Sequence, residues 1–88
     1  MTPKERFAEL AARADIKMNY AEPQRRQYWM GYRQGLGRAY HGSSYRPAGG
    51  HGRLMSLVKS DYEPHRQHGQ GYRDGLRALE KEAEPTAG

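Results

Sequence analysis

Cysteine is absent from this 88-residue chain. Without cysteine there is no disulfide framework, no thiolate nucleophile and no zinc site with sulfur ligands. This absence is typical of a reducing compartment, and we therefore predict a cytoplasmic protein. The beginning of the sequence lacks the uninterrupted apolar run of a signal peptide, and no stretch approaches the roughly 18 apolar residues of a membrane span. We predict no contact with a membrane.

Apolar side chains are also scarce. Hydrophobic residues make up 35% of the sequence, and seven of them are tyrosines, whose rings end in a polar hydroxyl. Soluble domains contain about 45–50% apolar residues when glycine is counted among them. A chain of this length forms one domain, residues 1–88, near the lower size limit for a self-supporting core. We expect a small core and a partner that supplies part of the missing burial.

Positive charge is concentrated in the middle of the chain. The whole sequence carries a net charge of +5, but residues 23–77 contain ten arginine or lysine residues against three acidic ones, which gives +7. Nine of these ten are arginine, whose planar guanidinium binds phosphates and carboxylates bidentately and stacks on bases and aromatic rings. The pattern favours RNA, a ribonucleoprotein or an acidic protein patch as partner, although a mixed solvated surface has a similar composition.

Helix signals dominate the local sequence. Thr2, Pro3 and Glu5 form a capping-box start, and apolar residues then recur at helical spacing, so we predict a helix over residues 3–18. The fold class is therefore all-α, a small bundle of three main helices plus a short helix, with a Gly-rich loop between two repeat helices. The other predicted segments are helices at 23–41, 54–60 and 62–83, a flexible loop at 42–52 and a frayed tail at 85–88.

An internal repeat is the most informative pattern in the sequence. Residues 31–36 read Gly-Tyr-Arg-Gln-Gly-Leu and residues 71–76 read Gly-Tyr-Arg-Asp-Gly-Leu, with five of six unchanged. Each copy spaces two glycines four residues apart, which clears a strip of helix surface for another backbone. Because each glycine costs about 1 kcal/mol relative to alanine inside a helix, we predict that the two repeat helices cross at these strips; alternatively, a strip faces a phosphate backbone or a partner helix. The helix-packing glycines are Gly31, Gly35, Gly71 and Gly75.

Aromatic residues alternate with the arginines around both copies, as in surfaces that bind unpaired bases. Trp29, Tyr32 and Tyr72 lie on the apolar stripes and are expected in the core. Tyr28, off the stripe, and Tyr45, in the loop, are the better candidates for contact with a partner. The residues predicted to bind a nucleic acid or another partner are Arg25, Arg26, Tyr28, Arg33, Arg38, Tyr45, Arg46, Arg66, Arg73 and Arg77.

Four histidines raise the question of a metal site or a catalytic base. His65 and His68, three residues apart, can share a helix face, but a zinc site of four histidines without a sulfur or carboxylate ligand is unusual. The sequence contains no paired carboxylates, nucleophile elbow, P-loop or dinucleotide-binding fingerprint. We predict no metal, no cofactor, no catalytic residue and no enzyme activity.

The repeat resembles the paired helices of ribosome modulation factor, a family of small basic proteins that bind the ribosome and silence it. That family more often has tryptophan at the position of Tyr72, and the helix predicted at 3–18 is additional to its pattern. The resemblance implies docking on ribosomal RNA through the basic residues near the two copies. The matching residues are Gly31, Tyr32 and Gly35 in the first copy, and Gly71, Tyr72 and Arg73 in the second.

Short helices of the Gly-Tyr-Arg-x-Gly type are also similar to those of small phage-encoded proteins, a group whose inhibitors of host defence include anti-CRISPR proteins. A basic inhibitor of an RNA-guided complex would hold an acidic protein patch, guide RNA or bound DNA through its arginines. A helical adaptor or homodimer, with the glycine strips and tyrosines as its interface, is the third alternative. We predict stoichiometric binding to RNA or a ribonucleoprotein, with inhibition by occlusion. Salt distinguishes the alternatives, because phosphate-driven binding weakens steeply with salt whereas an apolar interface changes little.

Overall fold

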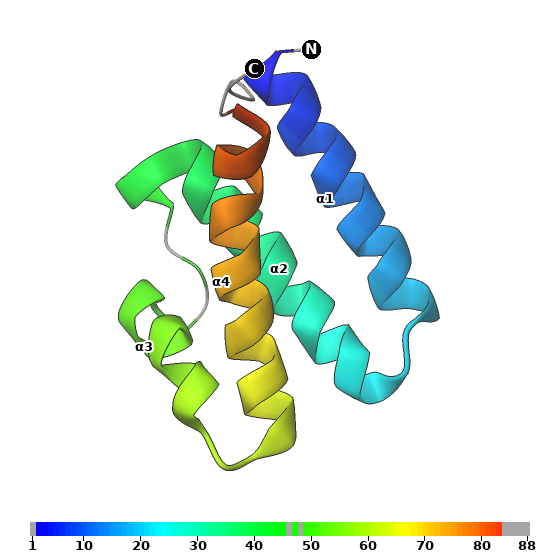
Figure 1. Cartoon of the computed structure of the whole chain (residues 1–88), viewed down its shortest axis with the longest axis vertical. Helices are drawn as coiled ribbons and strands as arrows, with labels where there is room; N and C mark the ends of the chain where they lie inside the picture. The colour runs from blue at the N-terminus through cyan, green and yellow to red at the C-terminus, as the bar shows by residue number, and fades with distance from the viewer. Residues whose placement is uncertain (1, 46, 48, 84–88) are drawn as a thin grey trace.

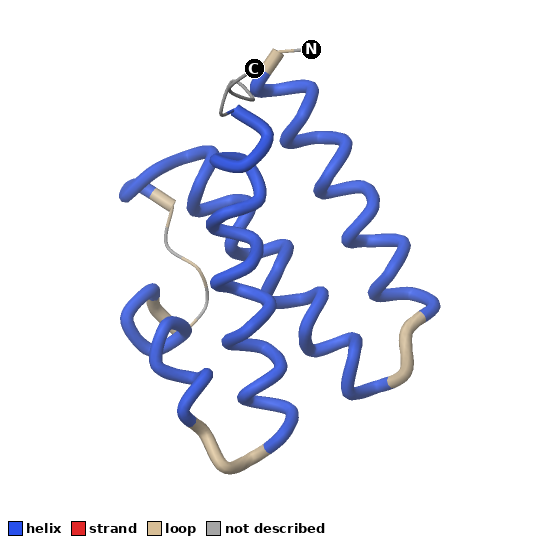
Figure 2. The backbone as a smooth tube through the Cα atoms, viewed as in Figure 1, coloured by secondary structure: helices blue, strands red, loops and turns tan. Residues whose placement is uncertain are grey.

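The chain forms an all-α fold, which confirms the fold class predicted from the sequence (Figure 1). The computed structural model describes residues 2–45, 47 and 49–83. No strand occurs within these residues, most of which are helical (Figure 2), and no helix among them has the length and apolar character needed to cross a lipid bilayer. The elements are α1 (Pro3–Tyr20), α2 (Pro23–His41), the 3₁₀ turn η1 (Gly42–Ser44), α3 (His51–Ser56), the 3₁₀ turn η2 (Leu57–Lys59) and α4 (Glu63–Ala83).

Helix α1 begins where the capping signal predicts. The Thr2 hydroxyl accepts a hydrogen bond from the Glu5 backbone N–H at 3.1 Å, and the Glu5 carboxylate accepts one from the Thr2 backbone N–H at 3.4 Å. These two bonds satisfy donors that a helix start leaves open. The helix continues two residues beyond its predicted end, to Tyr20, and its apolar side buries Leu10 and Ala14.

Helices α2 and α4 pack against each other along the two glycine strips. A Cβ atom added at Gly31 would collide with the backbone of α4, and one added at Gly71 would collide with the backbone of α2. Gly35 and Gly75 face each other across the same contact, where an added Cβ would meet the opposite Cα at 3.0 to 3.1 Å. This is the crossing that the glycine spacing predicts, because only residues without a side chain let two helix backbones approach so closely.

The two repeat helices run parallel and in register. An added Cβ at Gly31 would lie 2.9 Å from the backbone nitrogen of Tyr72, and one at Gly71 would lie 3.0 Å from that of Tyr32. Equivalent positions, 40 residues apart in the sequence, therefore meet across the crossing. Figure 1 shows both helices running from the lower end of the view toward the upper end. The repeat thus creates an approximate two-fold axis between α2 and α4.

The same axis relates the elements that precede the repeat helices. α1 runs antiparallel to α2 after a turn of two residues, and the α3–η2 segment runs antiparallel to α4 (Figure 1). The α3–η2 segment packs on α4 at Gly69, where an added Cβ would collide with Leu57 and Val58. The fold is therefore a pair of related helical hairpins, and the second hairpin has a much shorter first arm.

Each hairpin contributes its own part of a small core. Leu10, Ala11 and Leu36 form a buried cluster between α1 and α2. In the second hairpin, Tyr72 is fully buried, and its hydroxyl lies 2.5 Å from the ring Nδ1 of His51 in α3. Burial raises the pKa of Tyr72. The small number of buried side chains agrees with the low apolar content of the sequence.

The predicted bounds of the loop 42–52 and of the helix 54–60 are wrong. The 3₁₀ turn η1 occupies the first three residues of the loop, and α3 begins at His51, three residues before the predicted start. The reason is a tertiary contact, because the His51 ring meets Tyr72 of α4 edge-on and bonds to its hydroxyl. Gly50, with φ of 87°, lets the chain turn into the helix. Local composition carries no information about such a contact.

Candidate partner-binding surface

Two polar bonds flank the α2–α4 crossing, and the two-fold axis relates them. The Tyr28 hydroxyl donates to Asp74 Oδ2 at 2.5 Å, and the ring Nε2 of His68 lies 2.5 Å from Gln34 Oε1. Tyr28 and His68 occupy equivalent positions in the two copies, as do Gln34 and Asp74. Each repeat helix therefore presents one donor and one acceptor to the other, which fixes the register of the parallel pair.

Tyr28 belongs to this crossing and is not a free surface aromatic. The prediction that its side chain lies off the packed face is wrong, since the residue is half-buried and its hydroxyl is bonded to Asp74. Burial, followed by the hydrogen bond to the Asp74 carboxylate, raises the pKa of Tyr28. The Arg25 guanidinium lies 4.4 Å from the centre of the Tyr28 ring, within cation–π range.

His68 occupies the position equivalent to Tyr28, and its titration should make the stability of the protein depend on pH. Burial, and then the charge of His65, lowers the pKa of His68. The folded protein therefore takes up this proton less readily than the unfolded chain, whose histidines titrate at about pH 6.5. The free energy of unfolding should fall as the pH drops from about 7.5 to about 5, because the unfolded state binds more protons there.

A His68→Tyr variant isolates this contribution. The new tyrosine copies Tyr28 and can still donate a hydrogen bond to Gln34, but it does not titrate in the same pH range. We expect acidification from about pH 7.5 to about pH 5 to lower the free energy of unfolding of this variant less than that of the wild-type protein. Urea unfolding at these two pH values measures the difference. Equal losses in the two proteins would show that His68 does not contribute.

Arginines of α2 are held by α1. Arg33 Nε forms an ion pair with Asp15 Oδ1 at 3.2 Å, and its guanidinium carbon lies 6.0 Å from the centre of the Phe7 ring. Arg26 Nε donates to the backbone oxygen of Met18 at 3.2 Å. Both side chains therefore join α1 to α2, and a partner that binds them through the same nitrogen atoms must displace these bonds.

Arg38 and Tyr45 lie at the end of α2. Arg38 donates to the backbone oxygen of Tyr45 at 3.2 Å, and the Tyr45 ring packs over Gly37, where an added Cβ would lie 2.8 Å from the ring. The ring also stacks on His41, with centroids 5.9 Å apart. Tyr45 lies outside the helices, as predicted, but its half-buried ring already has these contacts. Arg46, another predicted contact residue, lies outside the described residues.

The arginines of α4 share one side of the helix. Arg66, Arg73 and Arg77 are separated by seven and four residues, a spacing that brings side chains to the same face of an α-helix. By the same geometry this face points away from Gly71 and Gly75, and so away from α2. Arg66 and Arg77 are exposed and Arg73 is half-buried. We call these three arginines the α4 basic face.

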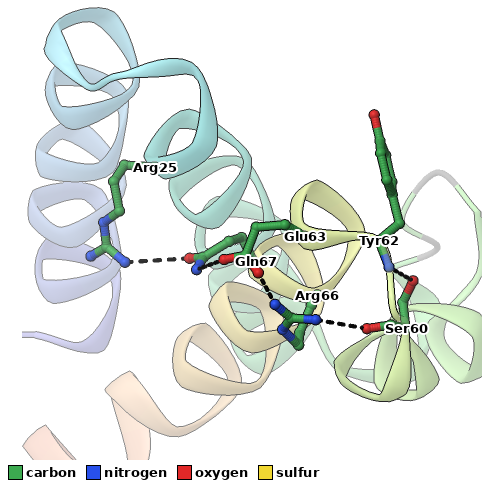
Figure 3. A network of polar contacts seen from close by, with 6 residues as sticks. All are labelled: Arg25, Ser60, Tyr62, Glu63, Arg66 and Gln67. Carbon is green, nitrogen blue, oxygen red and sulfur yellow. Dashed lines mark hydrogen bonds and ion pairs between the residues drawn. The ribbon is translucent and has the colours of Figure 1, made fainter.

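Figure 3 shows how one end of the α4 basic face is connected to α2. Arg66 forms an ion pair with the Glu63 carboxylate and donates to the backbone oxygen of Ser60 at 3.1 Å. Glu63 also accepts from Gln67 Nε2 at 2.9 Å, and Gln67 Oε1 accepts from Arg25 at 3.4 Å. Arg25 and Arg66 thus belong to one polar network at the beginning of the two repeat helices. Both remain exposed, so they can reach a partner without a change of fold.

The other two members of the α4 basic face lack such bonds. The side chains of Arg73 and Arg77 make no hydrogen bond or ion pair with any residue that the structure describes. Asp74, next to Arg73 in the sequence, accepts instead from the hydroxyl of Tyr28 and, at 3.1 Å, from Gln70 Nε2. Among the predicted arginines that the structure describes, Arg73 and Arg77 are therefore the two whose side chains are not bonded.

Sequence analysis missed two exposed tyrosines. Tyr20, at the end of α1, is 87% exposed, and Tyr62, just before α4, is 60% exposed. The signal in the sequence is Tyr-Ala-Glu-Pro at 20–23 and Tyr-Glu-Pro at 62–64, which extends the repeat upstream. A one-residue difference in length obscures the match. These tyrosines flank the start of α2 and the start of α4.

The histidines do not come together. Within the described ranges, no group of three or more histidine or acidic side chains could hold a metal ion. His65 meets the Tyr62 ring edge-on, with centroids 4.8 Å apart, whereas His68 bonds to Gln34 across the helix crossing. The two histidines that the sequence places three residues apart thus contact different partners, although the charge of His65 still lowers the pKa of His68.

Comparison with protein-family models, with curated proteins and with solved structures finds no match to this chain. The likeness of the repeat to ribosome modulation factor, and that of the chain to anti-CRISPR inhibitors, therefore stays a prediction.

Proposed function

We propose that this protein is a non-enzymatic binding protein that docks on RNA or a ribonucleoprotein through the α4 basic face and inhibits its target by occlusion. The observation that carries the proposal is the pair Arg73 and Arg77, two arginines on one side of a helix without a bonding partner among the described residues. Since Asp74 is bonded to Tyr28, it does not neutralise them by a direct contact. Their charge is available to phosphates.

An unbonded arginine gains more from a phosphate than a bonded one does. At Arg33, the phosphate has to displace Asp15 from a 3.2 Å contact, so the new bond is offset by the broken one. At Arg73 and Arg77 it replaces water, and the release of counterions from the nucleic acid adds favourable free energy. The α4 basic face spans twelve residues, 66–77, or about 16 Å along the helix axis, which is long enough for more than one phosphate.

The helix crossing holds this face in place. Gly71 and Gly75 bring the backbone of α4 onto the backbone of α2, on the side of the helix opposite the arginines. Helix α4 therefore has little freedom to move or roll when a partner binds. Such preorganisation reduces the entropy that binding has to overcome.

Affinity capture tests the proposal. The tagged protein would be incubated with a lysate of the organism that encodes it, with and without nuclease and at low and high salt, and the retained proteins and nucleic acids would be identified. We expect ribosomes or another ribonucleoprotein, with recovery lost after nuclease treatment or at high salt. Recovery of one protein regardless of both treatments would contradict an RNA-directed function.

An acidic protein surface is the alternative partner, as for an anti-CRISPR-type inhibitor or a helical adaptor. Guanidinium groups bind carboxylates as well as phosphates. The observation in its favour is an exposed apolar pair on α1, where Ile16 is 57% and Tyr20 is 87% exposed, four residues apart on the same side of the helix. Salt-insensitive capture of a protein would identify this alternative.

A further inference from the structure

Both hairpins present an exposed tyrosine at the same end of the molecule. Tyr20 and Tyr62 have the two largest exposed fractions, 87% and 60%, among the exposed large hydrophobic residues of the described part of the chain. Each precedes the glutamate and proline at which a repeat helix starts, residues 22–23 and 63–64. Because α2 and α4 run parallel, these starts lie at the same end (Figure 1). Tyr20 and Tyr62 therefore lie close to the starts of α2 and α4, at one end of the fold.

Neither ring is packed into the protein. The Tyr20 side chain makes no hydrogen bond or ring contact with any described residue. The Tyr62 ring meets only His65 edge-on, again counting described residues alone. Each ring therefore offers a flat aromatic face on which a base of a partner can stack.

Basic side chains outnumber acidic ones around the two rings. In the segments 17–26 and 59–66, five basic residues stand against three acidic ones, and all five basic side chains are exposed. One of the acidic residues, Glu63, is already paired with Arg66. The basic residues are Lys17, Arg25, Arg26, Lys59 and Arg66, and the acidic residues are Glu22, Asp61 and Glu63.

We propose that Tyr20 and Tyr62 are two stacking platforms for unpaired bases of single-stranded RNA. Arg25, Arg26 and Arg66, in the flanking segments, would hold the phosphates through the guanidinium N–H groups that their bonds within the protein leave unused. This inference rests on the proposed function and specifies the form of RNA that the protein recognises. In a duplex the faces of the bases are already stacked on each other, so only a single-stranded segment offers bases to both rings.

A fluorescence-anisotropy titration tests the inference with a labelled RNA of about 12 nucleotides, as a single strand and as the duplex of the same sequence. We expect at least about 10-fold tighter binding of the single strand. Tyr20→Ala and Tyr62→Ala should each weaken single-strand binding about 10-fold, and the double variant about 100-fold, because base stacking is lost. Tyr20→Phe keeps the ring and should keep the affinity. Met30→Ala, which shortens a 37% exposed side chain on α2, is the matched control and should bind as the wild-type protein does.

The outcomes separate this inference from the function on which it rests. Wild-type affinity in the tyrosine double variant, or equal affinity for single strand and duplex, overturns the stacking platforms alone, provided that Arg73→Gln with Arg77→Gln still weakens binding. If no RNA binds, both proposals fail. The control for a loss of binding is the fold of the double variant, measured by far-ultraviolet circular dichroism and by its melting temperature. Because both side chains are exposed, we expect both measurements to match those of the wild-type protein.

Discussion

Replacing Gly71 with alanine is expected to destabilise the protein severely. The new Cβ would lie well inside 3.0 Å of the carbonyl oxygen of Tyr28, and a backbone atom cannot rotate away as a flexible side chain does. The two repeat helices then have to separate, which exposes buried side chains such as Leu36 and Tyr72. We expect a loss of about 3 kcal/mol or more, out of the roughly 4–13 kcal/mol typical of a chain this long. The melting temperature should fall by more than about 10 °C.

Gly52→Ala is the matched control for this experiment. Gly52 also lies inside a helix, α3, but an added Cβ there has nothing within 4 Å. Alanine favours the helix and should leave the melting temperature unchanged or raise it slightly. Thermal unfolding followed by circular dichroism measures both variants. A Gly71→Ala protein that melts together with the wild type would contradict the close backbone contact between α2 and α4.

Replacing Arg73 and Arg77 together with glutamine is expected to weaken RNA binding about 100-fold and to leave the fold intact. Each guanidinium would lose a charge-assisted hydrogen bond to phosphate, worth about 1.5–3 kcal/mol, and every 1.4 kcal/mol corresponds to about a tenfold change in affinity. Neither side chain bonds to a described residue, so stability should change by no more than about 0.5 kcal/mol. Titration of labelled RNA at physiological salt measures the affinity, and a thermal melt checks the fold.

The matched control removes the same charge from α1. Lys4→Gln with Arg13→Gln changes two exposed residues, of which Arg13 is paired only with Glu9 on the same helix among the described residues. This double variant should keep most of the affinity, because a change in overall charge alone acts weakly at physiological salt. Equal losses from the two double variants would mean that total charge drives binding, and would remove the α4 basic face from the mechanism.

The glycine spacing is enough to predict that the repeat helices cross, but it leaves their relative direction open. Gly35 and Gly75 each clear a strip of helix surface whether the partner helix runs parallel or antiparallel. The direction is set by the α3–η2 segment, which carries the chain back along α4 so that both repeat helices start at one end. The apolar stripes were also predictable, because Leu36 and Tyr72 follow the 3.6-residue period and both are fully buried.

The polar contacts could not be predicted in the same way. Tyr28 meets Asp74, 46 residues away, only because the two helices are parallel and in register. The repeat makes Arg33 and Arg73 look equivalent, but α1 brings Asp15 to the first, whereas the short α3–η2 segment brings no carboxylate to the second. The symmetric variant Arg33→Gln with Arg73→Gln would therefore mix the loss of an ion pair inside the protein with a loss of binding. Arg73 and Arg77 are the cleaner pair to replace.

The salt dependence of RNA affinity tests most directly whether the α4 basic face binds phosphates. The dissociation constant for a single-stranded RNA of about 12 nucleotides would be measured at several salt concentrations, with the wild-type protein and with Arg73→Gln/Arg77→Gln. We predict a linear fall of log affinity with log salt, and a slope that the double variant reduces by about 1.4, which is about 0.7 for each phosphate that is no longer neutralised. An affinity that does not change with salt, or a slope that is the same in both proteins, would contradict phosphate binding by this face.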